Sequence, residues 1–247
     1  MTQIEQLAEK VMKSSHLTVL TGAGMSAESG VPTFQGPDGA FKGYPPEELA
    51  NHKRFDLDPQ LVWQWYDWRR QKIAACQPNM GHLVLAKLSR KPGFSLITQN
   101  VDGFHEKCGT QNVIRFHGCI WEMRRAYDQD EEPDIWWNDE VPLTAIPPLC
   151  PQTNKLCRPN VIWYGENINA EALAKSTLAA SNCDVFITIG TSSVVRPAAD
   201  LIELAKESGA FTAEINPEET PAENYIDLKI GATAVEALTA LDGKIHA

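Results

Sequence analysis

Short apolar runs alternate with stretches of helical periodicity along the chain. Five runs have the length and the β-branched content of buried strands; they are residues 17–20, 94–98, 113–116, 184–189 and 211–215. Three other stretches space their apolar residues as helices do; they are residues 1–15, 170–180 and 198–207. This alternation predicts an α/β fold in which a Rossmann-like parallel sheet carries helices on both faces.

Two segments interrupt the alternation and predict a second, smaller lobe. Residues 37–76 contain a loop followed by a tryptophan-rich helix, and residues 119–159 are rich in proline and acidic residues with little periodicity. We therefore expect a large lobe built from residues 1–36, 77–118 and 160–247, with the small lobe inserted into it.

The acidic composition narrows the range of partners. The formal net charge is -10, whereas nucleic acids and anionic lipid surfaces require a basic footprint, so we expect neither nucleic acid nor membrane as a partner. Basic proteins or peptides are the more natural partners. The N-terminal segment lacks the apolar core of a signal peptide and no apolar run reaches membrane-spanning length, which predicts a cytoplasmic protein.

Six cysteines are scattered through the chain. In the absence of a secretory signal, such scattered thiols are expected to be reduced. They are Cys76, Cys108, Cys119, Cys150, Cys157 and Cys183.

A glycine turn after the first predicted strand indicates a nucleotide site. Gly22-Ala23-Gly24 follows residues 17–20, and glycines let backbone N–H groups approach a pyrophosphate closely. The spacing to Gly30 differs from the G-x-G-x-x-G pattern, and no acidic residue clearly closes a second strand to hold a ribose. A plain dehydrogenase therefore fits poorly.

Five motifs in one order resemble the signatures of the sirtuins. Residues 22–36 resemble the NAD-binding loop of that family, and residues 98–105 resemble its second signature. The remaining three resemble its catalytic histidine motif, its peptide-binding strand and its ribose and phosphate contacts; they are residues 116–118, residues 161–166, and residues 190–193 with Pro197. Five such matches between residues 22 and 197 make the whole chain resemble a single sirtuin-type catalytic domain.

The resemblance implies an NAD-dependent protein-lysine deacylase that acts on acyl-lysine proteins or peptides. Its products are nicotinamide, O-acyl-ADP-ribose and free lysine. In this interpretation His117 is the general base, Asn100 and Asp102 hold the nicotinamide ribose and carboxamide, and Phe34 shields the reactive carbon. The residues implied in binding NAD are Gly22, Ala23, Gly24, Ser26, Ser29, Thr33, Phe34, Gln35, Gln99, Asn100, Asp102, Gly190, Thr191, Ser192 and Asn216.

Each of these residues also has an ordinary structural interpretation. A histidine before glycine is often a loop residue, and Asn100 and Asp102 are typical turn formers. The serines of these motifs are equally typical helix caps; they are Ser26, Ser29, Ser192 and Ser193. Only the combination of motifs favours the catalytic interpretation.

A tyrosine and an arginine in the tryptophan-rich helix suggest the acyl group. Tyr66 and Arg69 stand three residues apart and share a helix face. They match the Tyr-x-x-Arg pair with which desuccinylating and demalonylating sirtuins bind a distal carboxylate. An exposed arginine among core aromatics is the alternative. The resemblance further implies peptide contacts from Trp163, Tyr164, Gly165 and Glu166.

The chain departs from the family in its small lobe. Most sirtuins hold a structural zinc ion with two Cys-x-x-Cys pairs, and here the first pair is missing and the second has the wrong spacing. We expect no metal, and an apolar core in place of zinc; its expected members are Ile135, Trp136, Trp137, Val141 and Leu143. A three-cysteine site of Cys119, Cys150 and Cys157 is the alternative.

A second departure leaves two other functions open. Gln35 stands where the family usually has arginine, so a charge that would help to order the NAD loop is absent. One alternative is an NAD-dependent protein ADP-ribosyltransferase, and the other is a module that binds NAD or ADP-ribose without turnover.

Overall fold

The larger of two sheets in the computed structural model has six parallel strands. The model describes residues 1–33, 40–127 and 134–246. The strands lie in the order β3-β2-β1-β7-β8-β9. Their bounds are β1 Leu17–Thr21, β2 Phe94–Thr98, β3 Val113–Arg115, β7 Val185–Ile189, β8 Phe211–Ile215 and β9 Leu228–Ile230. The five predicted strands are confirmed, and β9 is an additional edge strand.

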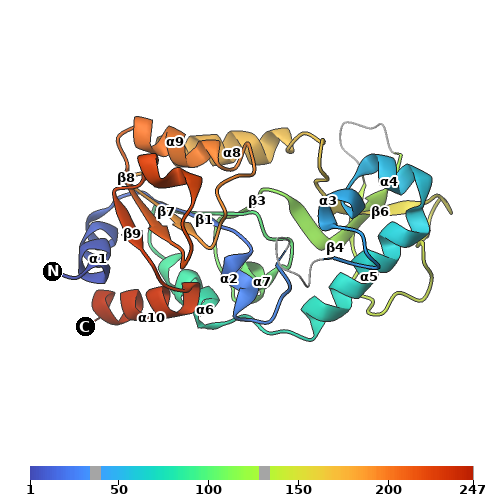
Figure 1. Cartoon of the computed structure of the whole chain (residues 1–247), viewed down its shortest axis with the longest axis horizontal. Helices are drawn as coiled ribbons and strands as arrows, with labels where there is room; N and C mark the ends of the chain where they lie inside the picture. The colour runs from blue at the N-terminus through green and yellow to red at the C-terminus, as the bar shows by residue number, and fades with distance from the viewer. Residues whose placement is uncertain (34–39, 128–133, 247) are drawn as a thin grey trace.

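Helices cover both faces of this sheet, which confirms the predicted Rossmann-like α/β fold (Figure 1). On one face lie α1 (Gln3–Lys13), α6 (Met80–Leu88) and α10 (Ala234–Ile245), and on the other lie α8 (Ala170–Ser181) and α9 (Asp200–Glu207). Side chains of a strand alternate between its faces. Val19 of β1 accordingly packs with the first group and Leu20 with the second.

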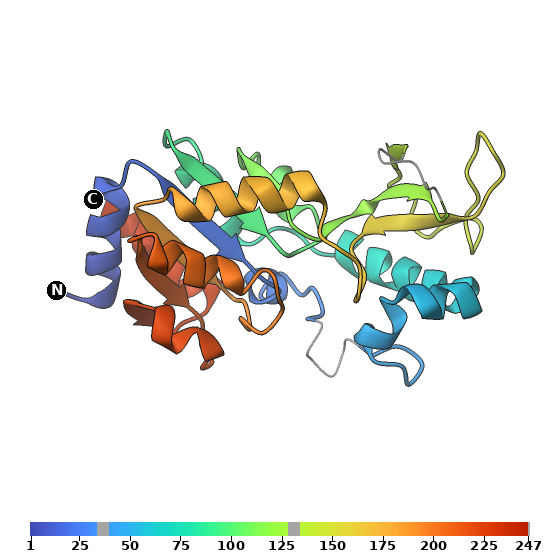
Figure 2. The ribbon, with the colours of Figure 1, turned by 90° about the horizontal axis from the view of Figure 1, so that it is seen from above.

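A three-stranded antiparallel sheet lies to one side of the large sheet (Figures 1 and 2). Its order is β5-β4-β6, with β4 Gly118–Arg125, β5 Ile135–Trp137 and β6 Cys157–Val161. Three helices pack beside it; they are α3 Pro46–Leu49, α4 His52–Leu57 and α5 Pro59–Ala74. The hydrophobic pattern of the sequence did not predict these strands, because β6 contains Pro159 and the pairing of β4 is irregular between Cys119 and Met123. The exact division of the chain into two lobes stays a prediction.

The apolar core predicted for the small lobe is partly wrong. Leu143 is buried and Trp136 packs against the core. Ile135 and Trp137, by contrast, are 49% and 55% exposed, because they lie on the outward face of β5, which is the edge strand of the small sheet among the described residues and pairs with β4. The buried apolar cluster is instead built around α5, from Val62, Trp63, Trp65, Tyr66 and Ile73.

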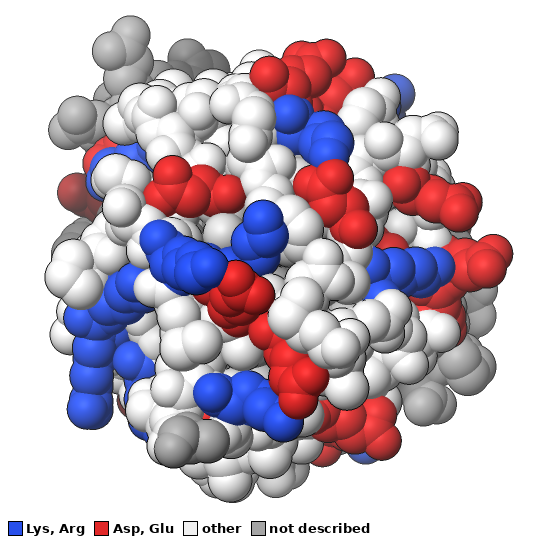
Figure 3. Space-filling model, turned by 90° about the vertical axis from the view of Figure 1, so that its left-hand side faces the viewer, with Lys and Arg blue, Asp and Glu red and all other residues white. Residues whose placement is uncertain are grey.

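Charges of both signs are interleaved on the face of the large lobe shown in Figure 3. Ion pairs such as Lys87–Asp242 and Lys244–Glu5 join its helices. In the described part of the chain, no helix has both the length and the apolar character needed to cross a bilayer.

Candidate active site

The predicted motifs converge at one edge of the large sheet. Gly22 follows β1, Gln99 follows β2, and His117 comes shortly after β3. On the other side of β1, Gly190 follows β7 and Asn216 follows β8. The strand order reverses direction between β1 and β7, and the crevice outside such a switch point is where open α/β sheets bind ligands.

The glycine turn packs directly against the turn after β7. A Cβ atom built on Gly22 would lie 2.7 Å from the carbonyl oxygen of Gly190, and one built on Gly24 would lie 2.7 Å from the Cα atom of Gly190. Gly190 itself has a φ of 57°, a conformation that glycine adopts without strain. Glycine is therefore required on both turns, because a side chain on either would collide with the facing backbone. The short helix α2 (Gly24–Ala27) begins within this turn.

Two serine hydroxyls near these turns are candidate ligand contacts. The Oγ atoms of Ser29 and Ser193 are buried and have no hydrogen-bond partner among the described residues. Ser193 also has a φ of 55°, which places a serine in the left-handed region. Buried hydroxyls are rarely left without partners, so both are suited to bind a polar ligand in the crevice.

The His117 ring is held in one tautomer. Its Nδ1 lies 3.2 Å from the carbonyl oxygen of Gln99. A carbonyl only accepts hydrogen bonds, so Nδ1 carries the proton and Nε2 keeps the lone pair of a base. Burial also lowers the pKa of His117 below its ordinary value, and the imidazole is therefore neutral at neutral pH.

Asn100 and Asp102 form one hydrogen-bonded cluster with Ser26. The Asn100 amide donates to the carbonyl oxygen of Gly22 at 2.9 Å and to the Ser26 hydroxyl at 3.3 Å. Ser26 in turn donates to Asp102 at 2.7 Å. Asp102 is 5% exposed, and burial raises its pKa. The cluster ties the end of β2 to the glycine turn.

His82 of α6 joins this cluster, and sequence reasoning missed it. Its Nε2 lies 3.4 Å from the Ser26 Oγ, and its ring packs against that of His105, with ring centroids 4.9 Å apart. Burial lowers the pKa of His82 to about 3, so the ring is neutral. The position of His82 in the middle of an apolar helix was a signal that could have drawn attention to it.

Thr191, which lies after β7, is hydrogen-bonded to the segments that follow β2 and β8. The Gln99 amide donates to the Thr191 hydroxyl at 2.9 Å, and the Asn216 amide donates to the Thr191 carbonyl oxygen at 2.9 Å. Ser192 and Thr33 are both half-buried in loops. Phe34 and Gln35 lie outside the described residues.

Tyr66 and Arg69 come from α5 and are buried together. Asp58 caps the first turn of this helix through the Leu61 N–H, and Pro59 stands at its first position, a combination typical of helix starts. Tyr66 is 3% exposed and Arg69 is 5% exposed. The surface arginine considered as the alternative is therefore wrong. Burial lowers the pKa of Arg69, while Asp102 and Tyr66 oppose this effect.

Of the predicted peptide contacts, Tyr164 and Gly165 are exposed, Trp163 is buried and Glu166 is half-buried. Tyr164 is 42% exposed, its N–H donates to the Ala50 carbonyl oxygen at 2.9 Å, and Gly165 beside it is exposed. Trp163 is 2% exposed, and the Glu166 carboxylate binds Arg158 at 2.5 and 2.8 Å. The strand β6 ends at Val161, so the motif that follows it is a loop.

The cysteines do not gather into a metal site. All six are free. Within the ranges that the structure describes, no three His, Cys, Asp or Glu side chains are grouped so as to hold a metal ion. The proposed set of Cys119, Cys150 and Cys157 is thus not brought together. Cys150 and Cys157 lie on two arms of a hairpin paired through Leu149 and Leu156, whereas Cys119 lies in β4 near Asn160.

Comparison with known proteins gives consistent matches over nearly the whole chain. The Sir2 family model matches residues 22–197. An NAD-dependent protein deacylase of Aquifex aeolicus is 47% identical over 218 residues, covering 88% of this chain and 90% of that protein. NAD-dependent protein deacylase 1 of Archaeoglobus fulgidus is 41% identical over 243 residues, covering 96% of each.

Solved structures agree with these matches. The crystal structure of a Sir2 homologue–NAD complex has a TM-score of 0.91 at 40% identity, covering 98% of this chain and 93% of that one. A complex of Sir2 with a p53 peptide and NAD+ has a TM-score of 0.87 at 28% identity, covering 99% and 98%.

Proposed function

The chain belongs to the Sir2 family, and we propose that it is an NAD-dependent protein-lysine deacylase releasing nicotinamide, O-acyl-ADP-ribose and free lysine. Relatives that match almost its whole length are named NAD-dependent protein deacylases. The observation that carries the proposal is the His117 ring, whose Nε2 is kept as a base beside the strand ends where Gly22 and Gly190 meet.

The crevice has features that fit a dinucleotide. The Gly22 and Gly190 turns pack too closely for a Cβ atom on either, so neither turn carries a side chain at these positions, and the Ser29 and Ser193 hydroxyls are buried without a partner in the described chain. The side chains and turns that would hold NAD are Gly22, Ala23, Gly24, Ser26, Ser29, Gln99, Asn100, Asp102, Gly190, Thr191, Ser192 and Asn216. When bound, NAD supplies the ribose carbon that accepts the acyl oxygen as nicotinamide leaves.

His117 is assigned the removal of a proton from a ribose hydroxyl. Because the Gln99 carbonyl holds Nδ1–H, the Nε2 lone pair is the only proton acceptor of the ring. Because burial lowers the pKa of His117, the ring is ready to accept that proton at neutral pH. Asn100 and Asp102 are assigned the ribose and the carboxamide, and the roles of Thr33, Phe34 and Gln35 stay predictions.

We further propose a preference for acyl groups that end in a carboxylate, such as succinyl and malonyl. The Tyr66 hydroxyl accepts a hydrogen bond from the Trp163 indole at 2.8 Å, which leaves its own proton for another acceptor. Arg69 keeps its charge, because a guanidinium is not deprotonated in proteins. A buried guanidinium and a phenol on one helix face form a suitable receptor for a carboxylate.

The acylated peptide is proposed to lie along the exposed loop beside Tyr164 and Gly165. The backbone of this loop pairs with residues of the small lobe, through the bridge between Asn51 and Tyr164, and an extended peptide can add to such a backbone by main-chain hydrogen bonds. The small lobe is proposed to hold together without zinc. The cytoplasmic location stays a prediction from the N-terminal sequence.

A single incubation separates the candidate functions. Purified protein with NAD and a succinyl-lysine peptide is expected to release nicotinamide and unmodified lysine in equal amounts, as measured by mass spectrometry. Exchange of His117 for alanine should abolish both products, because the Nε2 lone pair that is assigned the ribose proton is removed with the ring. Transfer of label from NAD to an acceptor protein would instead favour the transferase. Binding of NAD without nicotinamide release would favour the non-catalytic module.

A further inference from the structure

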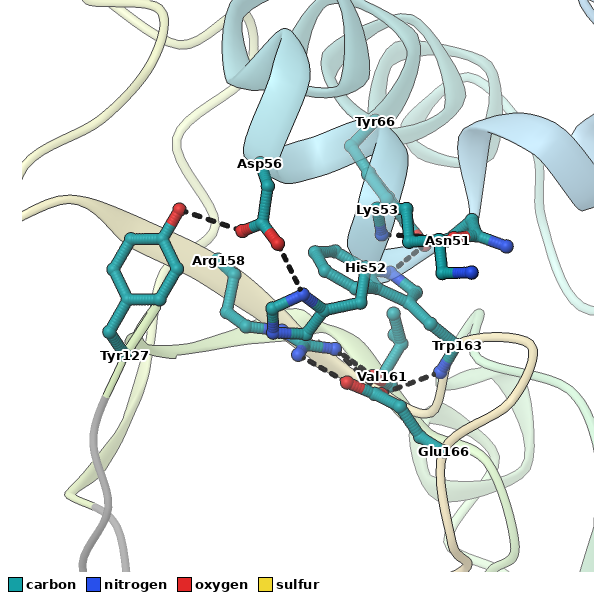
Figure 4. Close-up of polar contacts among 10 residues, drawn as sticks. All are labelled: Asn51, His52, Lys53, Asp56, Tyr66, Tyr127, Arg158, Val161, Trp163 and Glu166. Atoms are coloured by element: carbon teal, nitrogen blue, oxygen red, sulfur yellow. Dashed lines mark hydrogen bonds and ion pairs between the residues drawn. The ribbon is translucent and has the colours of Figure 1, made fainter.

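Trp163 is held from two sides by the ion pair between buried Arg158 and half-buried Glu166. Arg158 is 1% exposed, and its guanidinium carbon lies 3.4 Å from the centre of the Trp163 ring. The Glu166 carboxylate binds Arg158 through two hydrogen bonds and also accepts from the Trp163 backbone N–H at 2.8 Å. Arg158 therefore holds the ring, by a cation–π contact, and Glu166 holds the backbone of the same residue. Figure 4 shows this connected set.

Two further rings pack against the indole. The Phe55 ring lies 5.0 Å from that of Trp163, and the His52 ring lies 6.1 Å away at an interplanar angle of 80°. A ring that is packed in this way cannot change rotamer without displacing its neighbours. The direction of its N–H group is thus set by the surroundings.

The fixed indole N–H determines where the Tyr66 proton points. An indole N–H only donates, so the Tyr66 oxygen is the acceptor in the 2.8 Å bond between them. The phenol proton must then point away from Trp163. Accepting one hydrogen bond also makes an O–H group a stronger donor, because chains of hydrogen bonds polarise one another.

We propose that Arg158, Glu166 and Trp163 are a positioning unit that holds the Tyr66 hydroxyl proton in the direction of the acyl group's distal carboxylate. The unit does not touch the reacting atoms, and it acts only through Tyr66. The inference rests on the proposed acidic-acyl function, and it gives Trp163 and Glu166 a role inside the protein in place of the direct peptide contact implied by the resemblance. It also adds Arg158, which sequence reasoning did not single out.

The decisive variant removes the indole N–H and keeps an aromatic ring. In Trp163→Phe, the KM for a succinyl peptide is expected to rise about five-fold, the effect of losing one ordinary hydrogen bond. The KM for an acetyl peptide and both kcat values should change less than two-fold, by roughly the scatter of such measurements. Arg158→Lys keeps the positive charge but loses the pair of hydrogen bonds to the Glu166 carboxylate. It should also raise the KM for the succinyl peptide.

A matched control separates positioning from general loss of stability. Trp63→Phe removes another buried indole N–H, which donates to the Cys157 carbonyl oxygen at 2.8 Å, from the same lobe. It should lower the melting temperature much as Trp163→Phe does without a selective effect on the succinyl KM. In the double variant with Tyr66→Phe, Trp163→Phe should add nothing further, because its effect passes through the missing hydroxyl.

The outcomes distinguish this inference from the proposed function. If the wild-type protein prefers the succinyl peptide and loses the preference in Arg69→Met but keeps it in Trp163→Phe, the positioning role is overturned alone. An additive double variant would overturn it in the same way. If the wild-type protein and Arg69→Met both treat succinyl and acetyl peptides alike, the acidic-acyl function fails and this inference fails with it.

Discussion

Position 69 holds the buried side chain on which the proposed acyl preference depends. Arg69 lies one helical turn after Tyr66 in α5 and is almost completely enclosed. Enclosing a guanidinium is costly, and an anion brought beside it offsets part of that cost. A neutral acyl group cannot do so. The proposed acyl preference therefore depends chiefly on the charge of this residue.

The corresponding prediction concerns Arg69→Met, which keeps the length of the side chain and removes its charge. We expect the KM for a succinyl peptide to rise by about ten-fold or more, as for loss of a hydrogen bond to a charged group. The acetyl peptide should be affected much less. Steady-state kinetics on both peptides tests this. Arg54→Met is the control, since Arg54 packs on Tyr44 in the same lobe and pairs with Glu48. Equal losses on both substrates in Arg69→Met would refute the carboxylate role.

At the scale of elements, the small sheet is held by packing against α5. Trp63, Ile120 and Met123 belong to one buried apolar cluster that joins this helix to β4. The Trp63 indole also donates to the Cys157 carbonyl oxygen in β6, and Arg70 donates to both oxygens of Asn138. In the proposed zinc-free lobe, these contacts take the place of the cross-links that a structural zinc ion provides.

From this packing we expect a small lobe that is independent of metal. Treatment with a strong chelator should leave the melting temperature and the deacylase activity unchanged, because the apolar cluster does not depend on thiolate ligands. Elemental analysis of the untreated protein should find far less than one zinc ion per chain. One zinc ion per chain, or unfolding on chelation, would contradict the proposal.

For the whole molecule, two buried histidines couple stability to pH. His82 and His105 are 0% and 1% exposed, and burial lowers the pKa of each to about 3. In the unfolded chain, histidine titrates near its ordinary pKa of about 6.5. Between these values the unfolded state binds more protons than the folded state, so acid favours unfolding.

The free energy of unfolding is therefore expected to increase as the pH rises from about 3 to about 6.5, by at most about 1.4 kcal/mol per pH unit for each histidine. Urea unfolding at a series of pH values measures the slope. Replacing His82 with glutamine should reduce it. Replacing His16, whose side chain is 60% exposed, should leave the pH slope of the free energy of unfolding unchanged. A slope unaffected by the His82 exchange would show that other groups carry the pH dependence.

Much of the large lobe could be predicted because short continuous stretches of its sequence are enough to identify its strands and helices. Runs such as residues 94–98 and 211–215 are long enough and apolar enough to read as buried strands, and the parallel sheet follows from their alternation with helices. The small sheet could not be predicted in this way. Its strands contain Pro159 and charged residues and are stabilised by contacts with a helix far away in the sequence.

The sequence by itself determined the family and predicted the kind of chemistry, because His117, Asn100 and the glycine turn that begins at Gly22 belong to motifs that are continuous in the chain. Only the tertiary structure decided which atoms perform it. The Gln99 carbonyl selects the His117 tautomer, and Trp163 directs the Tyr66 hydroxyl from 97 positions away in the chain. Such hydrogen bonds depend on the distance and angle between segments that folding brings together, and no local pattern of residues encodes these quantities.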